Sequence, residues 1–177
     1  MIKIEKKEIN FKYKVILERS IFIILLFTTL YVIFSFSNQS GQESSSLSKK
    51  VTEIIVNIIS KIKSMDESQK LQYIKDLHPI VRKLAHFSIY AVVGFSLMGL
   101  FNTYKIQDKY KVIWTVIIGA IYALSDEFHQ RFIPGRGPSI KDVGIDTLGV
   151  IFGMLVIMCF IKIINKRKIN NDLSEKV

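Results

Sequence analysis

The chain has 177 residues, of which 49% are hydrophobic and 23% are charged, and its net charge is +10. Long apolar runs separated by charged segments are typical of an integral membrane protein, and basic segments beside such runs anchor to anionic lipid head groups. We therefore expect a single membrane domain over residues 1–177 with no nucleic-acid partner. The single cysteine, Cys159, excludes an intramolecular disulfide and a metal site built from cysteine pairs.

The first apolar run covers about residues 20–37 and follows a basic N-terminal segment. It is just long enough to cross a hydrocarbon core of ~30 Å, and no small-residue cleavage site follows, so it predicts an uncleaved membrane helix. Residues 38–48 are rich in Ser, Gln and Gly and predict a loop. Residues 47–63 carry Leu, Val and Ile at helical spacing, which predicts an amphipathic helix that lies on the membrane surface or caps the bundle.

Three further apolar runs predict spans at about residues 80–101, 112–130 and 140–164. The fold class is thus an all-α, four-helix transmembrane bundle with an additional amphipathic helix in the first extracytoplasmic loop. Pro79 can be the first residue of the second span, where a missing N–H costs nothing.

The fourth span has its own local signals. Ser139 and Asp142 have the spacing of a capping box at its start. Gly149 and Gly153 have the small-residue spacing that lets a neighbouring helix approach closely.

Four spans place both termini and the loop 102–111 on one side of the membrane. That side holds fourteen of the 25 Lys and Arg residues. The positive-inside rule then predicts a multi-pass protein of the bacterial cytoplasmic membrane with both termini in the cytoplasm.

Polar residues gather near the opposite membrane face, at the ends of the second, third and fourth spans. Ionisable groups inside a membrane are costly, so such a group of residues is a candidate functional site. At ~1.5 Å per helical residue they lie at similar depth. The candidate ligand-binding residues are Arg82, Lys83, Tyr90, Glu127, Gln130, Arg131, Arg136, Asp142 and Asp146.

Three segments that contain or adjoin these residues have a recognisable motif. Asp126-Glu127-x-His129-Gln130, followed by Pro134-Gly135-Arg136 and Asp142, resembles the signature of the VanZ-like family of small membrane proteins. Lys83-x-x-His86-x-x-x-Tyr90 resembles the second-helix motif of that family, and Ser37-x-Gln39 its motif after the first helix. The chain departs from the family at Asp146, where the family usually has Asn. The resemblance implies a bacterial envelope protein linked to low-level resistance to teicoplanin, a lipoglycopeptide, without implying a reaction.

The chemistry of these residues leaves several alternatives open. Asp126, His129 and His86 are hypothetical catalytic groups, with His129 as a general base oriented by Asp126. The carboxylates and imidazoles could instead bind a divalent metal, or form a polar network that only joins the helices. Glu127 and Arg131 have the spacing of a surface ion pair. The sequence leaves the cofactor, the metal and the oligomeric state open.

Arginine usage favours a ligand over a purely structural network. Only five of the 25 basic residues are arginines, and Arg82, Arg131 and Arg136 all fall at this face. The guanidinium fork suits phosphate and carboxylate. We therefore expect binding or modification of an anionic envelope lipid, a lipid-linked or other cell-wall precursor, or a lipoglycopeptide. The alternatives are a non-catalytic scaffold for cell-wall machinery and a small transporter.

Overall fold

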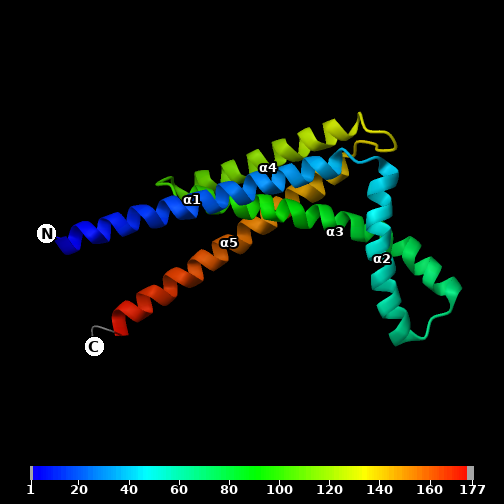
Figure 1. Cartoon of the computed structure of the whole chain (residues 1–177), viewed down its shortest axis with the longest axis horizontal. Coiled ribbons are helices and arrows are strands. Elements are labelled where there is room, and N and C mark those ends of the chain that lie inside the picture. The colour runs from blue at the N-terminus through cyan, green and yellow to red at the C-terminus, as the bar shows by residue number, and fades with distance from the viewer. Residues whose placement is uncertain (1, 175–177) are drawn as a thin grey trace.

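The computed structural model describes residues 2–174, with the side chains of residues 12–61 and 63–167, Ile9 and Asn170. It contains five helices (Figure 1): α1 (Ile2–Ser37), α2 (Gly41–Lys63), α3 (Glu67–Asn102), α4 (Asp108–Gln130) and α5 (Ile140–Ser174). Four of them, α1, α3, α4 and α5, are long and apolar enough to cross a membrane. The described residues contain no strand. The prediction of an all-α protein with four spans is therefore confirmed.

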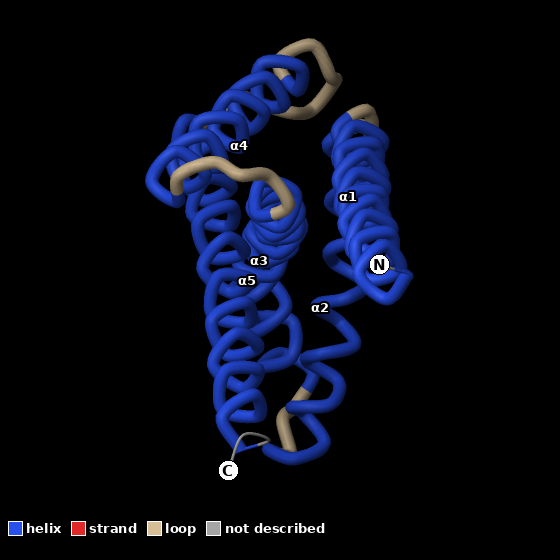
Figure 2. Tube along the Cα trace, turned by 90° about the vertical axis from the view of Figure 1, so that its left-hand side faces the viewer, coloured by secondary structure: helices blue, strands red, loops and turns tan. Residues whose placement is uncertain are grey.

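Helix α3 is the centre of the bundle. It packs against α5 most extensively and also contacts α1, α2 and α4. Figure 2, which looks along the bundle, shows α3 between α1 and α5. Buried side chains of α1, α3, α4 and α5 form a shared core around α3, and they include Leu26, Tyr90, Val93, Ala123 and Val150.

Glycines allow the backbones of α3 and α5 to touch. A Cβ atom at Gly149 would overlap the Phe87 carbonyl, and one at Gly153 would overlap the Ala91 carbonyl. Gly94 meets the Val150 carbonyl in the same way. The close helix contact predicted from Gly149 and Gly153 is thus confirmed, and it is the approach that small residues allow in membrane bundles.

The outer sides of the bundle carry large exposed apolar side chains, which include Ile24, Phe27, Tyr31, Ile121 and Leu155. In water this much exposed apolar surface would favour association with other apolar surfaces. Lipid tails provide an apolar environment in which these side chains need no protein partner. The surface of the bundle therefore agrees with the four membrane spans.

Helix α2 lies across one end of the bundle, opposite the start of α1 and the end of α5 (Figure 1). It packs on α3, and its buried residues are small or polar except for one valine: Thr52, Val56 and Ser60. Its larger apolar side chains remain exposed: Leu47, Val51, Ile54, Ile55 and Ile58. The amphipathic helix thus contacts the bundle through one side and keeps its apolar side free.

The expected loop over residues 38–48 is wrong beyond Ser40, because α2 begins at Gly41. The Ser40 hydroxyl accepts a hydrogen bond from the Glu43 N–H, and the Glu43 carboxylate accepts one from the Ser40 N–H. This reciprocal capping box satisfies free donors of the first turn and starts the helix inside the serine-rich segment.

The predicted start of the second span at Pro79 is also wrong. Helix α3 begins at Glu67, and Pro79 lies inside it. The Asp66 carboxylate caps the helix by accepting from the Gln69 N–H, and this bond lowers the pKa of Asp66 below its ordinary value. Pro79 removes one backbone donor, but the segment before it packs with α2 through the His78 side chain, which bonds Ser48.

The glycine contacts give a stability prediction. Gly153→Ala should lower the free energy of unfolding by about 1–3 kcal/mol, because the new methyl group forces α5 away from α3. Gly144→Ala, the same change on the same helix where no atom lies within 4 Å, should have no destabilising effect. Thermal melting of the purified protein, followed by the fluorescence of Trp114, measures both. Equal melting temperatures for the two variants would contradict the α3–α5 contact.

Candidate ligand-binding site

Two adjoining cavities lie at the end of the bundle that α2 crosses. The first, the apolar cavity, has a volume of about 360 Å³ and lies among α1, α2 and α3, with Ile33, Leu47, Val51 and Ile89 in its wall. The second, the polar cavity, has a volume of about 310 Å³ and lies among α3, α4, α5 and the loop between α4 and α5. Three residues are shared by the walls of the two cavities: Arg82, His86 and Arg136.

Arg136 reaches this position because the loop after α4 is fastened to the end of α1 and the start of α2. Its Nη2 donates to the Phe36 carbonyl at 2.6 Å, and the Gly41 N–H donates to the Pro134 carbonyl at 3.0 Å. Gly135 has a φ of 75°, which favours glycine. The Nε of Arg136 is buried and has no acceptor. Burial, followed by the charge of Arg82, lowers the pKa of Arg136, and the guanidinium stays charged.

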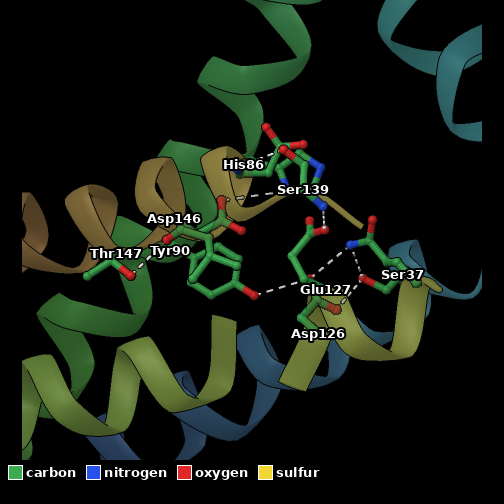
Figure 3. Close-up of polar contacts among 11 residues, drawn as sticks. Ser37, His86, Tyr90, Asp126, Glu127, Ser139, Asp146 and Thr147 are labelled. Carbon is green, nitrogen blue, oxygen red and sulfur yellow. Dashed lines mark hydrogen bonds and ion pairs between the residues drawn. The ribbon is translucent and has the colours of Figure 1, made fainter. Parts of the chain in front are cut away.

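Asp126 joins three helices through hydrogen bonds (Figure 3). Its Oδ1 accepts from the Ser37 hydroxyl at 2.5 Å, and its Oδ2 accepts from the Tyr90 hydroxyl at 3.1 Å and from the Gln130 amide at 3.1 Å. The carboxylate is buried and lines neither cavity. These donors satisfy the buried charge, so Asp126 holds α1, α3 and α4 together beside the cavities.

His129 does not pair with Asp126 in the way the catalytic hypothesis requires. Its Nε2 lies 2.8 Å from Oδ1 of Asn38, and its ring stacks on Phe34. Both partners belong to the end of α1 or the residue after it. His129 therefore lies outside both cavities, whereas His86 lines both.

Glu127 is buried and does not form the predicted surface pair with Arg131. Its Oε2 accepts from the Ser139 N–H at 2.8 Å, just before α5 begins. The predicted capping box at Ser139 is only half formed. The Ser139 hydroxyl accepts from the Asp142 N–H, but the Ser139 N–H donates to Glu127 and not to the Asp142 carboxylate. Arg131 is exposed and lines neither cavity. A buried carboxylate can cap a helix from another helix, which explains why local spacing misled the prediction.

Asp146 and His86 face each other across the contact of α5 and α3 (Figure 3). Oδ1 of Asp146 lies 3.7 Å from Nδ1 of His86, which is ion-pair distance but beyond a hydrogen bond. Asp146 has 0% exposure, and neither of its carboxylate oxygens has a hydrogen-bond donor. It lines the polar cavity, so its accepting capacity remains free for a ligand.

The polar cavity brings together most of the remaining predicted residues. Lys83, Gln130 and Asp142 line it with Arg82 and Arg136, whereas Tyr90 lies behind it and bonds Asp126. No group of three or more His, Cys, Asp or Glu side chains among the described residues is arranged to hold a metal ion.

Sequence reasoning missed His78, which also lines the polar cavity and whose Nε2 lies 2.8 Å from the Ser48 hydroxyl. His78, Arg82 and His86 are four residues apart and share one face of α3. The periodicity was visible in the sequence, but a helix that begins at Pro79 leaves His78 out.

The Asp126 junction gives a second stability prediction. Asp126→Asn places an amide donor among hydroxyl and amide donors, so it should cost about 1–3 kcal/mol of unfolding free energy. Tyr90→Phe removes one donor of three and should cost less. Thermal melting in detergent compares them, with Asp142→Asn as a carboxylate control of little effect. A melting temperature of Asp126→Asn equal to that of the unmutated protein would show that the junction contributes nothing to stability.

Comparison with known proteins identifies the family of the chain. The family model VanZ/LLP1 matches residues 22–162, which include the second and third spans, most of the first and fourth spans, and both cavities. No match was found among curated proteins or among solved structures. The matched region covers well over half of the chain. The chain therefore belongs to the VanZ/LLP1 family.

Proposed function

We propose that this protein binds a phosphate-bearing amphiphile of the bacterial envelope, a phospholipid or a lipid-linked cell-wall precursor. The observation that carries the proposal is the shared wall of the two cavities, where Arg82 and Arg136 stand between an apolar space and a polar one. A lipid has the same division between its tail and its head group. The tail would occupy the apolar cavity and the phosphate would lie at the two arginines.

The energetics of such binding divide in the same way. A tail that moves from the bilayer into the apolar cavity stays in an apolar environment, so it can enter the cavity without a solvation cost. The phosphate adds specificity, because guanidinium groups bind phosphate oxygens through charge-assisted hydrogen bonds. The Nε of Arg136 is a buried donor without an acceptor, and a phosphate oxygen would satisfy it.

We infer that the site faces the outer leaflet of the cytoplasmic membrane. The basic residues favour a cytoplasmic location for both termini and the loop between α3 and α4. Helix α2 lies at the other end of the bundle (Figure 1), and the residues that line both cavities belong to that end. Envelope precursors and lipoglycopeptides are present at that outer face, so the location suits the proposed ligands.

Family membership supports a role in sensitivity to teicoplanin-type antibiotics. In this proposal the effect arises from binding an envelope lipid or precursor, and no reaction is assigned. A scaffold for cell-wall machinery is a second candidate, favoured by the exposed apolar side of α2, which includes Leu47, Ile54 and Ile58. In a scaffold, polar substitutions on that side would reduce antibiotic tolerance more than substitutions in the cavities.

Lipid binding can be tested with Arg82, which lines both cavities. Arg82→Ala should weaken binding of dioleoylphosphatidylglycerol at least tenfold, a loss of about 1.4 kcal/mol, because one charged contact to the phosphate is gone. Native mass spectrometry of the delipidated protein measures this. Arg131→Ala, an exposed arginine near the same face, is the matched control and should bind normally.

The same variants test the cellular role. Arg82→Ala should remove any teicoplanin tolerance that the protein confers on a susceptible host, at unchanged membrane abundance, while Arg131→Ala should retain it. Equal lipid affinity in both variants and the unmutated protein would refute the binding site.

Orientation has a separate test. In a Cys159→Ser background, Gly137→Cys should react with a membrane-impermeant maleimide on intact cells, because Gly137 is exposed in the loop before α5. Lys109→Cys, exposed at the start of α4, should react only after the cells are opened. The opposite labelling pattern would reverse the inferred orientation and place the cavities in the cytoplasmic leaflet.

A further inference from the structure

We propose that the head group bound here is zwitterionic and carries a primary amine: Asp146 receives the ammonium group while Arg82 and Arg136 hold the phosphate. The inference rests on the proposed function of lipid binding and names the class of lipid. Phosphatidylethanolamine is the simplest lipid with this chemistry.

The first observation is that Asp146 lacks donors. Its side chain is fully buried in the wall of the polar cavity, and neither oxygen accepts a hydrogen bond. The imidazole of His86 is near at 3.7 Å but does not donate to it. A buried carboxylate without donors is costly, and the cost disappears when a ligand supplies them. Asp146 is therefore the position in the cavity wall where a cationic donor gains most.

The second observation is that the same cavity holds the complementary group. Nε of Arg136 is buried and lacks an acceptor, so the polar cavity offers one unused donor and one unused acceptor, each on a charged side chain. A ligand with a phosphate and an ammonium group satisfies both. A head group with a phosphate but no ammonium group satisfies the arginine and brings no cationic donor to Asp146.

The charges of the cavity wall point in the same direction. Arg82, Lys83 and Arg136 line it together with Glu127, Asp142 and Asp146, and His78 and His86 belong to the same wall. The cavity therefore offers charges of both signs, and complementary charges on the two sides of a complex determine its specificity. Glu127 already accepts from the Ser139 N–H, which leaves Asp146 as the buried acceptor for the ligand.

The missing hydrogen bonds also select the kind of cation. A primary ammonium has three N–H donors and can bond both oxygens of Asp146, whereas a quaternary ammonium such as choline has none. The adjoining apolar cavity, with Ile33, Val51 and Ile89 in its wall, favours a lipid over a soluble phosphoamine.

The experiment compares three lipids with identical dioleoyl tails: phosphatidylethanolamine, phosphatidylcholine and phosphatidylglycerol. The full-length protein, delipidated in detergent, is titrated with each and measured by native mass spectrometry. We expect the ethanolamine lipid to bind at least tenfold more tightly than the other two. Asp146→Asn should abolish this preference without loss of phosphatidylglycerol binding, since it removes only the acceptor charge.

Two controls separate the inference from trivial causes. Asp76→Asn changes an exposed carboxylate of α3 that lines neither cavity, and it should keep the preference. Asn is close in size to Asp and removes a buried charge, so Asp146→Asn should melt no lower than the unmutated protein. Glycerophosphoethanolamine, which has the head group without tails, should compete poorly, and effective competition would overturn the assignment to a lipid.

The outcomes distinguish this inference from the proposed function. Equal affinity for the three lipids, or a preference for the ethanolamine lipid that persists in Asp146→Asn, overturns the zwitterionic assignment. If binding still depends on Arg82 in that case, the proposed function stands with a different head group. Lack of saturable binding of any of the three lipids overturns both.

Discussion

The contact between the backbones of α3 and α5 is the constraint on which the rest of the structure depends. Glycine at positions 149 and 153 lets α5 lie against the carbonyls of Phe87 and Ala91. One consequence is local: His86 and Asp146 precede residues of this contact and are brought to ion-pair distance. A wider spacing of the helices would admit lipid or water between them, and the buried carboxylate would lose its enclosed position. Close packing and the character of the polar cavity therefore have one cause.

The second determinant is the way in which buried polar groups join helices that share little apolar contact. Asp126 binds Ser37 of α1 and Tyr90 of α3, and Glu127 caps the start of α5. Arg136 fastens the loop between α4 and α5 to the end of α1. Removing charges from water is costly, so each of these buried groups forms hydrogen bonds with donors or acceptors from another segment. Three described side chains have buried polar atoms without a partner: Asp146 and the Nε of Arg136, which line the polar cavity, and Oε1 of Gln39, which lines the apolar cavity.

Helix α2 adds the apolar wall that the proposed amphiphile site requires. Its stripe of Ser and Thr residues packs on α3, while Leu47 and Val51 contribute to the apolar cavity. The helix lies across the bundle end, so a lipid tail beside it would meet apolar side chains and a head group would meet Arg82 and Arg136. The shape of the site follows from a helix that uses its small polar side for packing and leaves its apolar side for lipid.

The sequence by itself determined the four spans and the amphipathic helix, because hydropathy and helical periodicity are local properties. It named several residues of the polar cavity but also Arg131 and His129, which lie outside it, and it missed His78. It could not determine where α3 begins. Asp66 caps the start of this helix, and the packing of the helix on α2 outweighs the tendency of Pro79 to interrupt it. It also could not assign partners among these polar residues. Asp126, His129 and Glu127 lie within four residues, yet each bonds a different helix or loop. Only the tertiary structure decided which carboxylate is satisfied and which remains free, because the donors come from segments far apart in the chain.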